Sequence, residues 1–541
     1  MTENGKVSPI RLQVMWTRLI ALVEEQAQTL LRTAFSPVVR ESGDLSAGIF
    51  DRRGRMLAQA VTGTPGHINT MARSVGFFLD LFPLETMEEG DVYVTNDPWY
   101  GTGHLNDYVV VTPSFYESNI VALFACTGHM TDVGGIGFSP AGEDVFYEGV
   151  TIPPMKLISR GKVNETLLAI AKANSRMPLE LEGDIYSQIA SNETGSRRLT
   201  ELLREVGQKD IVNLADYIVD ASRTAMAKRL AGLPASSASY SMTVDGFEEA
   251  IELCCSVQIK DGAVNVDWAG SSKASAYGIN VPLNYGTAYT SYALSCALAG
   301  DIPNNEGTLS AFTVRADKGS VLNATRPQPV ACRHVIGAML PDVVFGCLDQ
   351  IIPDLVPAES ASALWNLSIR GGENNRFATS IDTSGGTGAR PGLDGLSVTS
   401  FPSTVRGTPV EIVESATPLI FWKRELREGS GGDGETRGGL GQDMELGSQG
   451  PDGFTIFAAF DRITYPARGR KGGEAGAKGE LMLSTGEVLK GKGAHHVKAG
   501  QSIIIRTPGG GGYGDPSQRG SEARCVDTLR GYTSAKAATE R

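Results

Sequence analysis

The segment NDPWYGTGHLNDYVVVTP, residues 96–113, joins a polar, glycine-containing turn to an apolar run. A second segment, GHMTDVGGIG at residues 128–137, follows another apolar run over residues 120–126. Both runs are typical of buried strands. We therefore expect polar side chains of the two segments at strand ends, where loops can direct them into a cleft. In each segment a histidine follows a glycine and precedes an aspartate by three residues, and these residues are His104, Asp107, His129 and Asp132.

Two imidazoles and a carboxylate from these segments predict a catalytic metal site formed by His104, Asp107 and His129. Such ligands suit Zn²⁺, Mn²⁺ or Fe²⁺, and three protein ligands leave a coordination position open for water. We expect zinc, with manganese or iron as alternatives. Asp132 could be a further ligand or could accept the second N–H of a metal-bound imidazole. Without a metal, each histidine would donate to a backbone carbonyl in an ordinary loop.

Further candidates for the same cleft lie outside these segments. In RESGD, residues 40–44, the carboxylate of Asp44 or Glu41 could be a fourth metal ligand or a base for bound water, and a solvated turn is the alternative. His67, in GTPGHINT, is predicted to be a loop histidine that could line the cleft. The remaining histidines are predicted to be core or surface residues, and these are His334, His495 and His496.

A chain of 541 residues is too long for a single hydrophobic core, so two to four domains are expected. The patterns predict an α+β, multidomain fold with mixed α/β amino-terminal and middle regions and a β-rich, glycine-rich carboxy-terminal region. The predicted divisions are residues 1–235, which hold the metal site, residues 236–405 in the middle, and residues 406–541.

Apolar residues at steps of three and four predict a helix over residues 9–35, capped by Ser8. Residues 36–59 are predicted to form a turn and a strand hairpin. Further helices are expected over residues 69–81, 286–298, 334–352 and most of 160–235, and strands near 240–268 and 309–323. The glycine-rich segments beyond residue 405 match no phosphate-binding loop and are predicted to be tight turns between strands.

Composition excludes several classes of partner. The formal net charge of −12 gives no electrostatic reason to expect nucleic acid or an anionic membrane. Seven cysteines without a CxxC pair resemble neither a disulfide framework nor a zinc knuckle. The amino terminus lacks a basic-then-apolar leader, and no run of about 18 apolar residues occurs. We expect a cytoplasmic protein that is not bound to a membrane.

The sequence resembles the hydantoinase B/oxoprolinase family from about residue 9 to residue 516. That family comprises B-type subunits of ATP-dependent hydantoinases, oxoprolinases and caprolactamase, and related subunits of acetone and acetophenone carboxylases. The resemblance is carried by FSPVVRESGDLSAGIFD, NDPWYGTGHLNDYVVVTP, GHMTDVGG, EGVTIPPMKL, YGINVPLNYG, GGTGARPGLDG, GSGGDGETRGGLG and TPGGGGYGDP.

The resemblance implies a zinc or manganese ion held by His104, Asp107 and His129, with Asp44, or Glu41 in reserve, completing the site. It also implies an A-type partner that binds ATP in an actin/sugar-kinase-like fold. This chain lacks a phosphate loop and its length fits one B-type subunit, so the partner is expected as a separate chain in an α2β2 heteromer.

The implied reaction is ATP-dependent hydrolysis of a cyclic amide. The partner would phosphorylate the amide oxygen, the metal would lower the pKa of its water towards ~7 and present hydroxide to the activated carbon, and Asp44, Glu41 or Asp132 would move the proton.

Two alternatives to this reaction stay open. In a ketone carboxylase of the acetone or acetophenone type, an enol phosphate would meet CO₂ at the same metal. The segment VACRHVIG around Arg333 and His334 departs from the Asn-containing stretch expected of hydantoinases, which leaves room for a ketone substrate. In the other alternative, the chain is a structural subunit that only closes over the active site of its partner.

Overall fold

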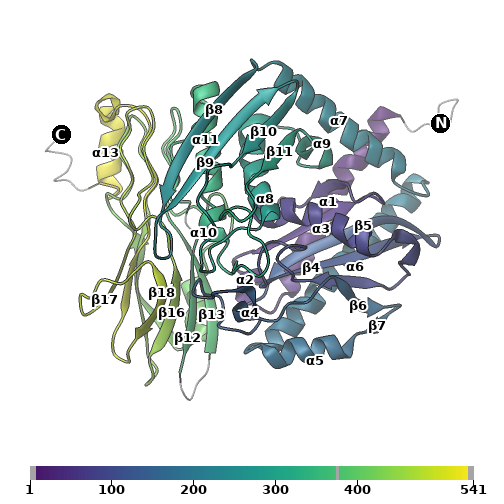
Figure 1. The fold of residues 1–541 in the computed structure, drawn as a ribbon, viewed down its shortest axis with the longest axis horizontal. Coiled ribbons are helices and arrows are strands. Elements are labelled where there is room, and N and C mark those ends of the chain that lie inside the picture. The colour runs from purple at the N-terminus through teal and green to yellow at the C-terminus, as the bar shows by residue number, and fades with distance from the viewer. Residues whose placement is uncertain (1–7, 363, 373–376, 534–541) are drawn as a thin grey trace.

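The computed structural model describes residues 8–362, 364–372 and 377–533. Its buried apolar side chains form three main clusters that follow one another along the chain. Figure 1 shows the corresponding regions, with the N-terminal part in purple and blue, the middle part in teal, and the C-terminal part in green and yellow on the left. Helices and several separate sheets make up the fold, so the predicted α+β, multidomain class is confirmed.

The N-terminal region is built on a seven-stranded sheet of order β2-β1-β5-β4-β3-β6-β7. Its strands are β1 (Leu45–Phe50), β2 (Met56–Gln59), β3 (Val92–Thr95), β4 (Asp107–Tyr116), β5 (Asn119–His129), β6 (Met155–Ser159) and β7 (Lys162–Val163). Its helices are α1 (Pro9–Thr33), α2 (Pro37–Arg40), α3 (Pro65–Leu81), α4 (Val145–Glu148), α5 (Glu165–Asn174), α6 (Pro178–Val206) and α7 (Val212–Ala231). The predicted first helix with its Ser8 cap and the β1–β2 hairpin are confirmed.

Helices cover both faces of the central strands. Val110 on β4 packs in the cluster that contains side chains of α1 and α6, whereas its neighbours Val109 and Val111 pack with α3. Adjacent residues of a strand point to opposite faces of the sheet. A continuous apolar run is therefore expected wherever both faces are buried, which explains the valines that follow Asp107.

The helix predicted over residues 69–81 begins earlier, at Pro65. The fixed φ of proline and its missing N–H suit the first turn of a helix. His67 consequently lies in the first turn of α3, and its predicted place in a loop is wrong.

The middle region has a four-stranded sheet of order β11-β10-β9-β8. Its strands are β8 (Ser236–Val244), β9 (Ile251–Lys260), β10 (Ala263–Asp267) and β11 (Phe312–Arg315), and its helices are α8 (Leu283–Leu294), α9 (Glu306–Leu309), α10 (His334–Gly337) and α11 (Leu340–Ile351). The helix predicted over residues 334–352 is thus interrupted between α10 and α11. The stretch His334–Ile351 has the length and composition of a membrane span, but 83% of it is buried inside the structure, as in a core helix.

The C-terminal region contains two four-stranded sheets, of order β13-β12-β16-β18 and β14-β15-β19-β17. The strands are β12 (Leu364–Gly371), β13 (Phe377–Ser384), β14 (Leu419–Leu426), β15 (Gln442–Ser448), β16 (Phe454–Ala459), β17 (Glu480–Leu483), β18 (Lys492–Val497) and β19 (Ile503–Arg506), and the helices are α12 (Val410–Ala416) and α13 (Ser521–Leu529). Strand β12 pairs with β16, so strands on either side of residue 405 share a sheet. The division of the chain at that residue stays a prediction.

Many of the late glycines lie where backbones approach one another, and turns account for only some of them. The N–H of Gly439 donates to the carbonyl of Thr387, and the N–H of Gly510 donates to the carbonyl of Gly439. A Cβ on Gly439 would lie 2.0 Å from the carbonyl oxygen of Leu396, and one on Gly510 would lie 2.0 Å from that of Thr387. Side chains are therefore excluded from this region by contact between chain segments.

Replacing Gly510 with alanine tests this explanation. We expect a loss of about 3 kcal/mol or more in stability, because the backbone of Thr387 cannot yield as a flexible side chain could. Gly76→Ala is the control, since nothing lies within 4 Å of a Cβ built there. Thermal unfolding should show a lower melting temperature for Gly510→Ala and no decrease for Gly76→Ala. Equal melting temperatures would contradict the packing argument.

Candidate metal centre

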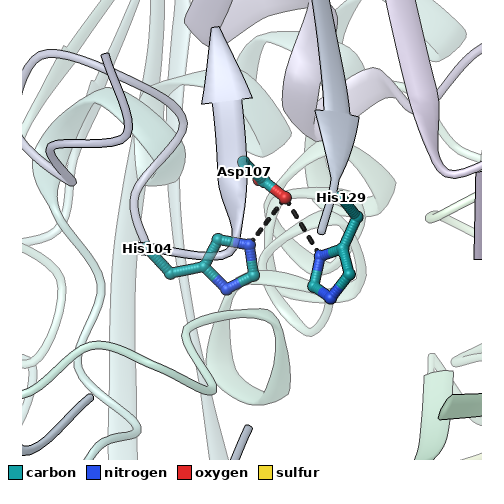
Figure 2. A group of neighbouring side chains, drawn as sticks. All are labelled: His104, Asp107 and His129. Atoms are coloured by element: carbon teal, nitrogen blue, oxygen red, sulfur yellow. Dashed lines mark hydrogen bonds and ion pairs between the residues drawn. The ribbon is translucent and has the colours of Figure 1, made fainter. Parts of the chain in front are cut away.

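The structure brings together the three predicted metal ligands at one end of the β4–β5 pair. Asp107 is the first residue of β4 and lies opposite His129, the last residue of β5, in the antiparallel register. His104 lies in the turn that precedes β4. Asp107 Oδ1 is 2.7 Å from His104 Nε2 and 3.0 Å from His129 Nδ1, and Figure 2 shows this oxygen between the two imidazoles. The three possible ligand atoms all lie within 4.8 Å of one another.

The other carboxylate oxygen of Asp107 accepts hydrogen bonds from groups outside the three ligands. Arg333 Nη2 and Thr102 Oγ1 each lie 2.5 Å from Oδ2, and His67 Nε2 lies 2.9 Å from it. Burial alone would raise the pKa of Asp107, but the imidazole of His67 and the charge of Arg333 hold that pKa well below its usual range. The carboxylate is therefore charged, and its Oδ1 is directed towards the two imidazoles.

The protonation of His104 follows from its contacts. Its Nδ1 lies 2.9 Å from the carbonyl oxygen of Ala331, which can only accept, so Nδ1 carries the proton. Burial and the charge of Arg333 lower the pKa of His104 to about 4, so the ring is neutral at pH 7. Its unprotonated Nε2 then faces the carboxylate of Asp107 at 2.7 Å. Two lone pairs at this distance repel each other unless they share a proton or bind a common metal ion.

The pKa of His129 is shifted in the opposite direction to that of His104. Burial alone would lower the pKa of His129, but its hydrogen bond to Asp107 and the charges of Asp107, Asp44 and Asp382 raise it. Binding of a metal through Nδ1 requires that this nitrogen be deprotonated, so a proton competes with the metal there. The set of two nitrogen ligands and one oxygen ligand fits zinc, manganese or iron.

Two of the three ligands, His104 and His129, border a small cavity with a volume of about 20 Å³. It is lined by side chains from all three regions, and these include Asp44, His67, Phe138, Tyr285, Tyr289, Arg333, His334, Asn366, Ser403 and Val405. His334 was predicted to be a core or surface residue. It is buried in the cavity wall, where its ring stacks on that of Phe138 with 5.4 Å between centroids.

Of the three carboxylates predicted to assist the metal, Asp44 lines the cavity. Its oxygens lie 3.6 Å from His67 Nδ1 and 3.8 Å from His129 Nδ1. Glu41 instead forms an ion pair with Arg40 at 2.8 Å. Both oxygens of Asp132 are bound to Arg176, to its guanidinium and its backbone N–H, each at 2.5 Å.

Two charged residues of the site were missed by the sequence analysis. Arg333 lies in the segment VACRHVIG, whose sequence does not predict its direct hydrogen bond to Asp107. Asp382 on β13 is 1% exposed and accepts a hydrogen bond from Asn366 at 2.8 Å. Burial and the charge of Asp44 raise the pKa of Asp382 to about 6. Nothing in the local sequence of either residue indicates its proximity to residues 104–129.

Comparison with known proteins identifies the relatives of this chain. A family model described as Hydantoinase B/oxoprolinase matches residues 8–516. A putative D-/L-hydantoinase chain of the B type from Pseudomonas sp. (strain NS671) is 27% identical over 569 residues, which cover 100% of this chain and 95% of that protein. The chain covers 41% or 42% of the length of the 5-oxoprolinases that it matches.

Two solved structures share the fold. The ATP-dependent caprolactamase from Pseudomonas jessenii matches with a TM-score of 0.91 at 26% identity, over 99% of this chain and 96% of that chain. The nucleotide-free structure of acetone carboxylase matches with a TM-score of 0.88 at 20% identity, over 98% of this chain and 79% of that chain. At this level of identity, the second match shows a common fold alone.

Metal analysis of the purified chain tests the candidate centre. We expect one tightly bound divalent ion per chain, and His104→Ala should weaken its binding by at least about 100-fold. Replacement of groups that only orient metal ligands already lowers the metal affinity by about 10–100-fold, so loss of a ligand should lower it at least as much. His495→Ala is the control, because this histidine lies in β18, far along the chain from the ligands, and bonds to Lys490. Equal metal content in the two variants would contradict the assignment.

The affinity for zinc should depend on pH through His129. Because the pKa of His129 is raised, a proton competes with the metal as the pH falls through that value. We expect the logarithm of the affinity to be level at high pH and to fall by about tenfold per pH unit below the pKa. A titration with a competing chelator should place the bend above pH ~6.5, the value of an ordinary histidine. A bend below that pH would contradict the raised pKa.

Proposed function

We propose that this chain, which belongs to the hydantoinase B/oxoprolinase family, is the metal-dependent B-type subunit of an ATP-dependent cyclic-amide hydrolase. The observation that carries the proposal is the convergence of three buried ligands, His104, Asp107 and His129, whose possible ligand atoms all lie within 4.8 Å of one another. Among the described residues, His104 Nε2 has no hydrogen-bond partner, as expected of an atom that would bind an ion. The relatives named for hydantoin and caprolactam chemistry support the reaction class.

His104 Nε2, Asp107 Oδ1 and His129 Nδ1 would hold the ion. A divalent metal bound there supplies a Lewis acid that polarises a carbonyl oxygen and makes a water molecule more acidic. Arg333 and His67 bind the second oxygen of Asp107 and keep its charge and orientation fixed. The hydrogen bond from Nδ1 to Ala331 keeps the Nε2 of His104 unprotonated.

Asp44 is proposed to accept the proton of the attacking water. Its carboxylate lines the cavity, and Thr64 Oγ1 donates to its Oδ1 at 3.1 Å, which leaves Oδ2 facing His129. Asp382, whose pKa is raised to about 6, is mostly deprotonated at neutral pH and is proposed to relay this proton to the departing nitrogen. Glu41 and Asp132, the other predicted bases, have arginine partners outside the cavity lining.

ATP is proposed to bind to a separate A-type chain in an α2β2 heteromer. That partner would transfer the terminal phosphoryl group of ATP to the amide oxygen, because an unactivated amide resists attack by water. One lactam, one ATP and two water molecules then give the amino acid, ADP and phosphate. The hydantoinase relative is named as one subunit of its enzyme, and the caprolactamase is ATP-dependent, which supports this arrangement.

The cavity must open to admit substrate. A volume of about 20 Å³ accommodates a water molecule or an ion, whereas small-molecule sites usually enclose about 300–1,000 Å³. The walls come from different regions of the chain, so relative movement of these regions, or docking of the partner, would create the space.

A ketone carboxylase is the second candidate function. Arg333 and His334 in the cavity wall favour it. The guanidinium of Arg333 and the imidazole of His334 can donate hydrogen bonds to a carboxyl group bound in the cavity. The assay below separates the two reactions.

The complex with the A-type partner should hydrolyse a cyclic amide with stoichiometric formation of ADP. We would supply ATP with hydantoins and lactams of different ring size and measure ADP together with ring-opened product. In parallel, acetone or acetophenone would be supplied with labelled bicarbonate. Fixation of label that depends on the ketone, without amide hydrolysis, would replace the proposed function with the second one. His104→Ala with unchanged activity would favour a purely structural subunit.

Replacing Asp44 with asparagine should lower kcat by about 10²–10⁴-fold, the usual contribution of a general base. Glu41→Gln is the matched control and should retain nearly full activity, because Glu41 is paired with Arg40. Metal content distinguishes the two roles of Asp44: an unchanged content indicates a base, and a reduced content indicates a fourth ligand. If Glu41→Gln were the more damaging change, Asp44 would not be the base.

A further inference from the structure

One motif of the sequence has no place in the site described above. EGVTIPPMKL begins with Glu148, the last residue of α4, which is 2% exposed. A single oxygen of this side chain, Oε1, accepts two backbone hydrogen bonds, from Val330 at 2.6 Å and from Ala331 at 2.7 Å. Glu148 therefore ties the N-terminal region to a segment of the middle region.

The same segment supplies two contacts of the candidate metal centre. The carbonyl of Ala331 receives the proton of His104 Nδ1. Two residues later, Arg333 donates to Asp107 Oδ2 and, through Nε, to the carbonyl of Thr102 at 2.7 Å. The position of the 330–331 backbone thus decides which nitrogen of His104 is left to face Asp107.

Glu148 is poorly suited to a purely stabilising role. The groups hydrogen-bonded to its carboxyl are backbone N–H groups, and among the described residues Oε2 has no hydrogen-bond partner. Burial raises the pKa of Glu148 to about 8. A buried polar group that lacks a partner destabilises a fold, so its presence here is better explained by the segment that it holds.

We propose that Glu148 is a positioning residue for the metal centre. By fixing the peptide groups of Val330 and Ala331, it directs the Ala331 carbonyl at His104 Nδ1 and keeps Nε2 available for the ion. The inference rests on the proposed function, since it assumes that a metal binds to His104. Glu148→Ala should then weaken zinc binding, although residue 148 does not touch the metal ligands.

Three variants of the full chain test this proposal. Zinc affinity would be measured by chelator competition, and the visible absorption of bound Co²⁺ would report the geometry of the ligands. Glu148→Ala should lower the affinity about 10–100-fold, as expected for loss of a group that orients ligands, and should change the Co²⁺ spectrum. Glu148→Gln should restore both to near wild type, because its amide oxygen still accepts both N–H groups. Glu148→Asp has a side chain shorter by one methylene, so its zinc affinity should lie between those of Glu148→Ala and Glu148→Gln. If Glu148→Ala does not fold, Glu148→Asp provides the test.

Asp245→Ala serves as the control. Asp245 is also a carboxylate that accepts backbone N–H groups, those of Ile463 and Thr464, but it lines a different pocket from the one at the metal centre. Its replacement should lower the melting temperature and leave the Co²⁺ spectrum unchanged. If folded Glu148→Ala and Glu148→Asp bind zinc with wild-type affinity and spectrum, the proposal is wrong. If the wild-type chain binds no metal, the proposed function itself fails.

Discussion

A single buried carboxylate constrains the whole structure. Asp107 is fully inaccessible to solvent, and an isolated charge at such a position would cost several kcal/mol. Its charge is compensated by Arg333 and His67 on one oxygen, while His104 and His129 face the other. Arg333 comes from the middle region and His67 from α3. Compensation of one charge therefore requires that separate parts of the chain be folded and docked, and the same docking aligns the nitrogen atoms for a metal.

The C-terminal region completes the cavity and is held by a second buried network. Arg462 lies 3.1 Å from Asp342 of α11 and 3.2 Å from Glu359, and all three side chains are buried. Loss of one member would leave an uncompensated charge inside the protein. The close packing of glycine backbones stiffens the same region. From this region Asn366 on β12 lines the cavity, and Asp382 on β13 accepts its hydrogen bond.

The small volume of the cavity suits the proposed chemistry. A phosphorylated amide reacts readily with water, so a site that closes around it would prevent premature hydrolysis of the intermediate. Asp107 and His129 lie on paired strands of one sheet and His104 lies in the turn before one of them, whereas other walls of the cavity come from the middle and C-terminal regions. A site divided in this way can keep its metal geometry while it opens for substrate.

The sequence alone predicted the first helix, the β1–β2 hairpin and the two strands β4 and β5, and it identified His104, Asp107 and His129 as the candidate ligands. These features are local: apolar periodicity reports which faces are buried, and two consecutive strands of one hairpin place Asp107 opposite His129. Only the tertiary structure decided that Arg333 and Asp382 join them and that the late glycines pack against one another. Those contacts join segments far apart in the chain, so they cannot be predicted from the pattern of neighbouring residues. They form because a buried charge is stable only with a partner of opposite charge or a hydrogen bond, and because closely packed backbones leave no room for side chains.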